Sequence, residues 1–255
     1  MGQAAQGGAR RLSPLRPWLA GARPFPYIGV MSLLIVFDCD GTLVDSQGAI
    51  IAAVRSAFDL AGLPVPADEA IRRIVGLSVP EAMQRLLPEL AVDDIPPLVA
   101  RFRAAFLEYR ATHGPALEPL FPGIRETLVA LDGAGHRLAV ATGKSRRGLE
   151  ITLRNHDLLD LFVALETADR HPSKPHPAML EAAMAAAGAG AEETLVVGDT
   201  SYDMLMAKAA RARGIGVAWG YHPERELLAA GAATIAARPA ELGGAIAALC
   251  EGSGS

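Results

Sequence analysis

The sequence predicts an α/β fold in which a Rossmann-like parallel sheet carries an inserted, all-helical cap domain. Three observations support this fold class. Short apolar runs recur along the chain, segments with helical spacing separate them, and one of these segments is far too long for a single connection between neighbouring strands. The 255 residues suffice for a sizeable core that carries an insertion.

Four apolar runs are typical of buried parallel strands. The first, Leu33 to Phe37, is continuous and ends abruptly at Asp38. The other three are Arg137 to Thr142, Thr194 to Asp199 and Gly214 to Trp219. Because helical spacing fills the segments between them, we expect strands and helices to alternate, with right-handed crossovers.

The segment between the first two runs predicts the inserted domain. Its apolar residues recur at intervals of three and four, which predicts helices over Gln47 to Ala61, Ala67 to Val75, Pro80 to Leu90 and Leu98 to Thr112. We therefore expect residues 46–119 to form the cap domain and residues 31–45 with 120–250 to form the α/β core. A helix over Ile124 to Leu131 is expected to lead back into the sheet.

The first 30 residues differ in composition from the rest of the chain. They hold four arginines, no acidic residue and many Gly and Pro, so we expect a disordered N-terminal extension, and we expect residues 251–255 to form a flexible tail. The whole chain has a net charge of -4; without residues 1–30 it keeps 20 basic against 28 acidic residues, or -8. This balance gives no support to a nucleic acid or an anionic membrane as partner.

Cysteine content and hydropathy suggest a compartment. Two cysteines cannot form a disulfide framework, and the chain has no apolar run of 18 residues that is free of charges and helix breakers. A cytoplasmic protein, monomeric or homodimeric, is therefore expected.

Polar residues collect at the ends of the predicted strands, where ligands bind in open parallel sheets. They are Asp38, Asp40, Gly41 and Thr42 after the first run, Thr142 and Gly143 after the second, Lys174 before the third, and Asp199 and Asp203 after the third. Four converging carboxylates need a cation. A hard divalent ion with oxygen ligands, most simply Mg²⁺, fits them.

Such a group suits phosphoryl transfer, whose transition state spreads negative charge over oxygens that need metal, ammonium and N–H partners. Asp38 and Asp40 can take two different catalytic roles. One carboxylate can attack phosphorus, while the other protonates the leaving oxygen and later activates water. Gly41 allows a sharp turn that directs backbone N–H groups at an anion. Thr142 can donate a hydroxyl and Lys174 a positive charge.

Four segments in this order resemble the ordered motifs of the haloacid dehalogenase superfamily. They are FDCDGTLVDS (Phe37 to Ser46), ATGK (Ala141 to Lys144), SKPHP (Ser173 to Pro177) and GDTSYDM (Gly198 to Met204). The resemblance implies a small helical cap on the core, as in phosphoglycolate phosphatases and β-phosphoglucomutases. It also implies that Asp38 is the nucleophile that becomes an aspartyl-phosphate and that Asp40 is the general acid/base.

The same resemblance implies roles for the other motif residues. Thr142 and Lys174 match the phosphate-binding pair. Asp199 matches a Mg²⁺ ligand with Asp203 as its supporting acid, and Asp38 and the backbone carbonyl of Asp40 would complete the metal ligands. The residues expected to contact substrate are Gly41, Thr42, Gly143, Lys144, Gly76 and Ser78, of which the last two lie in a segment, residues 75–81, that could equally be a plain connector between cap helices.

Three positions bear on which of the superfamily's reactions this chain catalyses. Dehalogenating members lack the second aspartate, so Asp40 favours phosphate esters. Mutase members carry Gly-x-Ser-Arg in the cap, whereas this chain has Val79 in place of the arginine, which favours hydrolysis. Gly143 stands where phosphoglycolate phosphatases usually have asparagine, and this leaves the ester unassigned.

The sequence therefore predicts a Mg²⁺-dependent phosphomonoester hydrolase for a small phosphorylated metabolite. One alternative is a phosphosugar mutase, and another is a non-catalytic phospho-aspartate signalling or regulatory protein. A signalling receiver domain would place its acidic pair first in the chain, whereas Asp199 and Asp203 come last here.

Several residues near the motifs have structural interpretations. Ser46 is expected to cap the helix that follows it, and Cys39 is expected to be a small buried packing residue. Lys144 could contact substrate or could stand in solvent at the start of a helix. His171 and His176 flank Lys174, but Mg²⁺ sites rarely use imidazole, so we do not expect them to be ligands.

Overall fold

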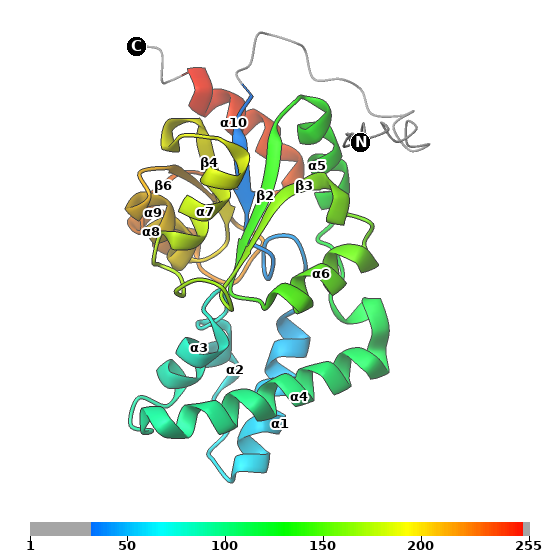
Figure 1. Cartoon of the computed structure of the whole chain (residues 1–255), viewed down its shortest axis with the longest axis vertical. Helices are drawn as coiled ribbons and strands as arrows, with labels where there is room; N and C mark the ends of the chain where they lie inside the picture. The colour runs from blue at the N-terminus through cyan, green and yellow to red at the C-terminus, as the bar shows by residue number, and fades with distance from the viewer. Residues whose placement is uncertain (1–31, 252–255) are drawn as a thin grey trace, which may run out of the picture.

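The structure is a computed structural model that describes residues 32–251 (Figure 1). The predicted disordered extension, residues 1–30, lies outside the described residues, as do residues 252–255 of the predicted tail. Glu251, the first residue of that tail, is helical, because helix α10 (Leu242–Glu251) continues through it. Within residues 32–251, no helix is both long enough and apolar enough to cross a membrane.

The described part of the chain contains one sheet of six parallel strands, in the order β3-β2-β1-β4-β5-β6. The strands are β1 (Leu34–Phe37), β2 (Arg137–Thr142), β3 (Phe162–Thr167), β4 (Thr194–Gly198), β5 (Arg213–Val217) and β6 (Ala232–Ala236). The predicted α/β fold with a parallel sheet is confirmed. Because all pairs are parallel, the carboxyl ends of β1, β2 and β4 lie at the same edge of the sheet.

Helices cover both faces of this sheet. One face packs against α5 (Ile124–Gly133), α6 (Arg146–Asn155) and α10, the other packs against α7 (Ala178–Ala187) and α8 (Ser201–Ala209), and α9 (Glu224–Ala229) contacts β5 and β6. In β1, Ile35 and Phe37 face the first set of helices, whereas Leu34 and Val36 face the second. Successive side chains of a strand point to opposite faces, so a central strand covered on both sides must be apolar throughout.

A second group of helices lies beyond one end of the sheet (Figure 1). It comprises α1 (Gln47–Ala61), α2 (Asp68–Arg72), α3 (Val79–Leu86) and α4 (Ile95–His113). These helices share an apolar cluster of their own that includes Val54, Phe58, Met83 and Leu98. The group corresponds to the expected helical cap, and the boundaries 46–119 remain a prediction.

The expected helices differ from the observed ones mainly at their ends. Helix α1 has its expected bounds, but α2 stops at Arg72, and α3 starts at Val79 and stops at Leu86. Helix α4 starts at Ile95, since Pro96 and Pro97 fall in its first turn, where proline is tolerated. Short 3₁₀ helices complete the described chain at Val92–Asp94, Gly114–Leu117, Leu159–Leu161, Ala191–Glu193 and Pro239–Glu241.

The two edge strands, β3 and β6, are not among the strands predicted from the sequence. Strand β3 contains Val163, which is 55% exposed, and β6 reads AATIA. An edge strand is less covered than a central one, so it needs no continuous run of large apolar residues. The four expected strands lie within two residues of their predicted bounds.

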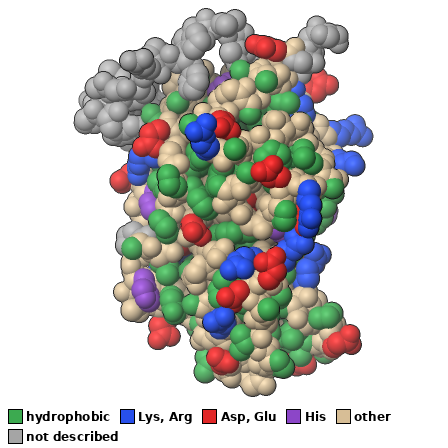
Figure 2. All heavy atoms as spheres, turned by 180° about the vertical axis from the view of Figure 1, so that it is seen from behind, with side chains coloured by type: hydrophobic (Ala, Val, Ile, Leu, Met, Phe, Trp, Pro, Cys, Tyr) green, Lys and Arg blue, Asp and Glu red, His purple; other side chains and the backbone are tan. Residues whose placement is uncertain are grey.

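The surface carries both signs of charge. On the face seen in Figure 2, acidic, basic and hydrophobic side chains are interspersed. Large exposed hydrophobic residues such as Leu60 and Val92 occur in different elements, α1 and the 3₁₀ turn before α4.

Candidate active site

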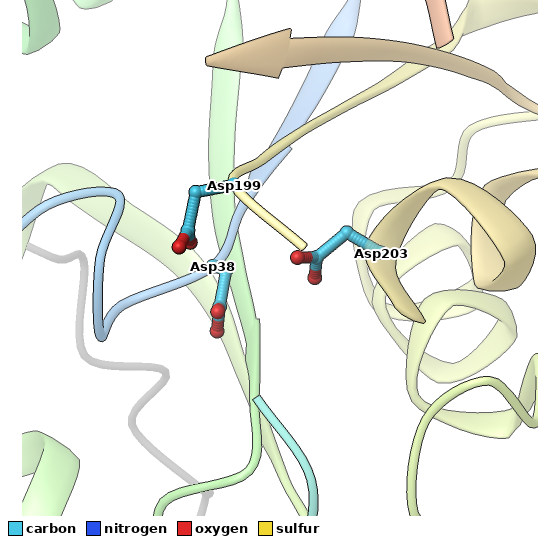
Figure 3. A group of neighbouring side chains, drawn as sticks. All are labelled: Asp38, Asp199 and Asp203. Atoms are coloured by element: carbon cyan, nitrogen blue, oxygen red, sulfur yellow. The ribbon is translucent and has the colours of Figure 1, made fainter. Parts of the chain in front are cut away.

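Three aspartates meet at the carboxyl ends of β1 and β4 (Figure 3). Asp38 follows β1, Asp199 follows β4, and Asp203 lies in the first turn of α8. One carboxylate oxygen of each lies within 4.8 Å of the other two, and all three side chains are buried. They meet because β1 and β4 are neighbours, with Phe37 opposite Val197.

Lys174 supplies positive charge to this acidic cluster. Its Nζ lies 2.9 Å from Oδ1 of Asp38 and 2.5 Å from Oδ1 of Asp203. Burial alone would lower the pKa of Lys174, but Asp203 and Asp38 raise it above its usual value. The lysine therefore stays charged, yet one ammonium group does not balance three carboxylates.

The acidic cluster fits a divalent cation. Burial raises the pKa of Asp38 to about 7; Lys174 opposes this rise, and Asp203 and Asp40 add to it. Burial, Asp38 and Asp203 likewise raise the pKa of Asp199 well above its usual value. Oδ1 of Asp38 has only the Lys174 ammonium group beside it, and Oδ2 accepts no hydrogen bond from the described residues. A buried oxygen without a donor is expected where a hard cation binds. Oxygens of Asp199 and Asp203 lie within 4.8 Å of an oxygen of Asp38, so the three aspartates are the candidate Mg²⁺ ligands.

Asp199 is held in place by two donors. Thr42 Oγ1 donates to Asp199 Oδ1 at 2.9 Å, and the backbone N–H of Tyr221 donates to Oδ2 at 2.9 Å. Gly41 has a φ of 89°, and a Cβ on it would lie 2.2 Å from Oδ2 of Asp199, so the turn needs glycine for two reasons. The hydroxyl of Thr42 thus contacts this acid, and its contact with substrate stays a prediction.

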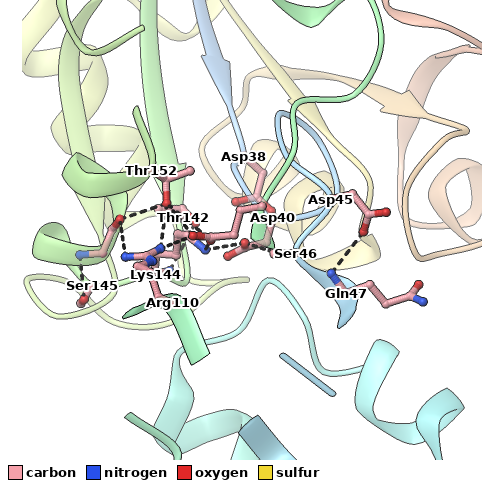
Figure 4. A network of polar contacts seen from close by, with 12 residues as sticks. Asp38, Asp40, Asp45, Ser46, Gln47, Arg110, Thr142, Lys144, Ser145 and Thr152 are labelled. Carbon is pink, nitrogen blue, oxygen red and sulfur yellow. Dashed lines mark hydrogen bonds and ion pairs between the residues drawn. The ribbon is translucent and has the colours of Figure 1, made fainter. Parts of the chain in front are cut away.

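The side chain of Asp40 belongs to a second polar network (Figure 4). Lys144 Nζ and Ser46 Oγ both donate to Asp40 Oδ1 at 2.5 Å. Lys144 also donates to Glu118 Oε1 at 2.7 Å, and Glu118 pairs with Arg110. Burial alone would raise the pKa of Glu118, but Lys144 and Arg110 lower it. The network thus couples the end of β1 to residues from α4 and from the chain just after it.

Two interpretations from the sequence are wrong. Lys144 does not stand in solvent, because its side chain is only 9% exposed between Asp40 and Glu118. Ser46 precedes α1, but its hydroxyl caps no helix N–H and turns to Asp40 instead. Asp45 Oδ1 accepts the hydrogen bond from the first helical N–H, that of Gln47, at 3.2 Å.

Glu118 and Arg110 are not among the site residues predicted from the sequence. Neither lies in a motif, and Arg110 is one of several arginines on its helix. Their only signal is burial, at 4% and 9% exposure, and burial depends on how the helices pack on the core.

The end of β2 lies against the cap. Thr142 is buried, and its Oγ1 accepts from the backbone N–H of Lys144 at 3.3 Å. A Cβ on Gly143 would lie 2.2 Å from the carbonyl oxygen of Leu77 and 2.8 Å from that of Gly76. An asparagine at position 143 would therefore displace this cap segment, which gives a physical reason for the departure from the usual motif.

Ser78 joins the same cap segment to the core. Its backbone N–H donates to Ser173 Oγ at 2.8 Å, and its own hydroxyl accepts from Glu81 N–H at 3.4 Å as the cap of α3. Residues 75–81 are thus in contact with the motifs around Gly143 and Lys174.

A cavity of about 390 Å³ lies between the cap helices and the carboxyl ends of β1 and β2. Asp40 lines it, and so do four of the residues expected to contact substrate, namely Gly76, Ser78, Gly143 and Lys144. Gly41 and Thr42 are not among the lining residues. The cavity therefore opens beside the acid/base candidate.

Three residues near the motifs lie outside this chemistry. Cys39 packs in the apolar core, where burial raises the pKa of its thiol, and this confirms the packing interpretation. His171 Nε2 pairs with Glu166, and His176 Nδ1 accepts from the backbone N–H of Ala178. Among the described residues, the acidic cluster contains neither histidine.

Relatives of known sequence are similar to this chain over most of its length. A protein from Dickeya dadantii named "Probable phosphatase IndB" is 39% identical over 229 residues, which cover 88% of this chain and 98% of the relative. The phosphoglycolate phosphatase of Vibrio parahaemolyticus is 33% identical over 193 residues, covering 74% of this chain and 85% of the relative.

Solved structures show the same fold. A hydrolase from Pseudomonas syringae superposes with a TM-score of 0.75 at 28% identity and covers 85% of this chain and 98% of its own. A haloacid dehalogenase-like family hydrolase from Streptococcus pneumoniae gives a TM-score of 0.73 at 25% identity, covering 84% and 98%.

The family model described as haloacid dehalogenase-like hydrolase matches residues 35–217, which include all four motifs. The resemblance drawn from the motifs is confirmed, and so is the expectation of an enzyme. The chain belongs to the haloacid dehalogenase-like hydrolase family.

Proposed function

We propose that this protein is a Mg²⁺-dependent phosphomonoester hydrolase that acts on a small phosphorylated metabolite through an aspartyl-phosphate on Asp38. The observation that supports the proposal is the acidic cluster itself: Asp38 is paired with Lys174 through Oδ1, its Oδ2 accepts no hydrogen bond from the described residues, and one of its oxygens lies within 4.8 Å of oxygens of Asp199 and Asp203. The names of the two relatives, a phosphatase and a phosphoglycolate phosphatase, support the same reaction class.

In the first half of the reaction, an oxygen of Asp38 attacks phosphorus and the ester P–O bond breaks. A proton on Asp40 passes to the leaving oxygen, so the alcohol departs neutral. Thr142 and Lys174 would bind the phosphoryl oxygens, as the family motif implies. Mg²⁺, when bound by Asp38, Asp199 and Asp203, would supply positive charge against the negative charge of the transition state.

In the second half, water attacks the phosphorus of the aspartyl-phosphate while Asp40 takes its proton. The bond between phosphorus and Asp38 breaks, which releases inorganic phosphate and restores the Asp38 carboxylate. Lys144 and Ser46 both contact Oδ1 of Asp40, so Oδ2 is the oxygen that we expect to exchange the proton. These two residues therefore position the acid/base.

Val79 does not support the alternative of a phosphosugar mutase, because mutases have an arginine at this position. This residue starts α3 and lines the cavity, where mutases would place a cation for a second phosphate. Hydrolysis needs no such group. Cytoplasmic location and a monomeric or homodimeric state remain predictions.

The test is release of phosphate from p-nitrophenyl phosphate with and without Mg²⁺. Turnover should need Mg²⁺ and should vanish in Asp38→Asn, while thermal unfolding shows that the variant remains folded. Asp93→Asn, which alters an exposed acid in the 3₁₀ turn before α4, is the matched control and should keep full activity. Undiminished turnover by Asp38→Asn would refute the nucleophile.

A further inference from the structure

The cavity lies on the leaving-group side of the site. Asp40 lines it, and in the proposed function, on which this inference rests, Asp40 gives its proton to the leaving oxygen. Asp38 does not line it. Since the nucleophile and the leaving group lie on opposite sides of phosphorus in an in-line displacement, the alcohol part of the ester must extend into this cavity.

The walls of the cavity are mainly apolar. Helix α1 contributes Ile50 and Val54, α3 contributes Met83, α4 contributes Phe102 and Phe106, and α6 contributes Ile151. A volume of about 390 Å³ lies within the range of about 300 to 1,000 Å³ seen for pockets that bury drug-sized molecules. The cavity is therefore sized for more than a two-carbon acid.

The buried cations of the cavity already have partners. Lys144 is paired with Asp40 and Glu118, and Arg110 is paired with Glu118. Both also stand over the ring of Phe106, at 5.5 and 5.2 Å from its centroid. A carboxylate next to the ester oxygen, as in phosphoglycolate, would lie beside Asp40 without a free buried cation among the lining residues.

The remaining lining arginines, Arg103 and Arg147, are exposed. An anion paired with these exposed arginines would be largely solvated and would gain little in binding. Apart from Asp40 and the paired cations, the cavity is lined mainly by apolar side chains, among them Phe102 and Phe106.

We propose that the natural substrate is a phosphate monoester of an apolar, ring-bearing alcohol. Its ring packs against Phe102 and Phe106, and burial of that ring in the cavity provides the selectivity.

The test compares esters whose leaving groups have similar intrinsic reactivity: ethyl phosphate, 2-phenylethyl phosphate and phosphoglycolate, all primary alkyl phosphates. We expect kcat/KM to rise at least about 10-fold from ethyl to 2-phenylethyl phosphate, because burial of one ring is worth at least that factor. Phosphoglycolate should be a poorer substrate than 2-phenylethyl phosphate.

A kcat/KM for phosphoglycolate or ethyl phosphate that equals or exceeds the value for 2-phenylethyl phosphate would overturn the inference. If p-nitrophenyl phosphate is still hydrolysed, the proposed function survives that result. If neither p-nitrophenyl phosphate nor any alkyl ester is hydrolysed, the proposed function itself fails.

A pair of variants tests the position of the ring. Phe102→Gln should reduce the ratio of 2-phenylethyl to ethyl phosphate about 10-fold, mainly through the phenylethyl ester. Leu60→Gln, on the exposed side of α1 and not among the residues lining the cavity, should leave the ratio unchanged. An unaltered ratio in a folded Phe102→Gln protein would contradict the contact with Phe102.

Discussion

Lys144 Nζ lies 2.5 Å from Oδ1 of Asp40, and the two side chains are only 9% and 10% exposed. The same ammonium group contacts Glu118 at 2.7 Å. One lysine from the end of β2 thus holds the acid/base of the end of β1 and a carboxylate from the chain after α4. This relationship connects the sheet, the cap and the proposed proton transfer.

Replacement of Lys144 by methionine should destabilise the fold. It leaves Asp40 and Glu118 as buried carboxylates without their shared cation, and loss of one partner from a buried ion pair costs about 3 kcal/mol. Urea denaturation measures this change. In the double variant Lys144→Met/Glu118→Gln the loss should be smaller than the sum of the two single losses, because each single substitution already removes the same contact between Lys144 and Glu118. Strict additivity would show that the two groups are not coupled.

Gly143→Ala tests the contact between the end of β2 and the cap. A Cβ at this position would lie 2.2 Å from the carbonyl oxygen of Leu77, so the cap segment must move. A shift of this kind beside the reacting groups should lower kcat/KM for p-nitrophenyl phosphate by about 10- to 100-fold.

The matched control for this variant is Gly133→Ala in α5, where an added Cβ meets no atom within 4 Å. The control should keep wild-type activity. Equal activities of the two variants would mean that the cap segment does not pack on Gly143 during turnover.

Mg²⁺ should stabilise the folded protein. A ligand that binds only the folded state at 100 times its Kd adds about 2.7 kcal/mol to the free energy of unfolding. Asp199→Asn removes one of the candidate ligands and should abolish most of this gain, whereas Asp93→Asn should keep it. Thermal unfolding with and without Mg²⁺ measures this stabilisation. If Mg²⁺ stabilised Asp199→Asn as much as the wild type, Asp199 would not be a metal ligand.

His136 should make stability depend on pH at the opposite end of the sheet. Its Nδ1 accepts from the backbone N–H of Leu33 at 3.3 Å, and burial lowers the pKa of the imidazole below its usual 6.5. The unfolded chain therefore takes up a proton at higher pH than the folded protein. The stabilisation is full above about pH 6.5 and is lost as the pH falls through the lowered folded-state pKa.

Chemical denaturation at about pH 7.5 and about pH 5.5 tests the role of His136. The wild type should lose more stability than His136→Gln over this interval, because glutamine does not titrate. Equal losses of stability in the wild type and in His136→Gln would contradict a role for His136 in the pH dependence.

The acidic cluster could be predicted because its members stand at strand ends. Asp38 and Asp199 follow buried apolar runs, whose carboxyl ends lie at one edge of a parallel sheet, and the observed pairing of β1 with β4 makes the two aspartates neighbours. Lys174 and Asp203 were predicted from their places before and after the third apolar run, and the motifs suggested their roles. The sequence thus predicts the residues that depend on local position in a parallel sheet.

The environment of Asp40 could not be predicted in the same way. Glu118 and Arg110 reach Lys144 only through the packing of α4 and the following chain on the core, and no periodicity reports that packing. Ser46 is an example. A serine before a helix normally caps it, but the hydroxyl of Ser46 donates to the nearby carboxylate of Asp40 instead, and this contact could not be predicted from the sequence.

The proposed reaction passes through a covalent phosphate on Asp38. Acid quenching during Mg²⁺-dependent turnover of p-nitrophenyl phosphate, followed by peptide mass mapping, measures it. We predict a hydroxylamine-sensitive phosphate on Asp38 that accumulates in Asp40→Asn, where water is no longer activated, and that is absent from Asp38→Asn. Undiminished turnover by Asp38→Asn, or a phosphate carried by any other residue, would contradict the account.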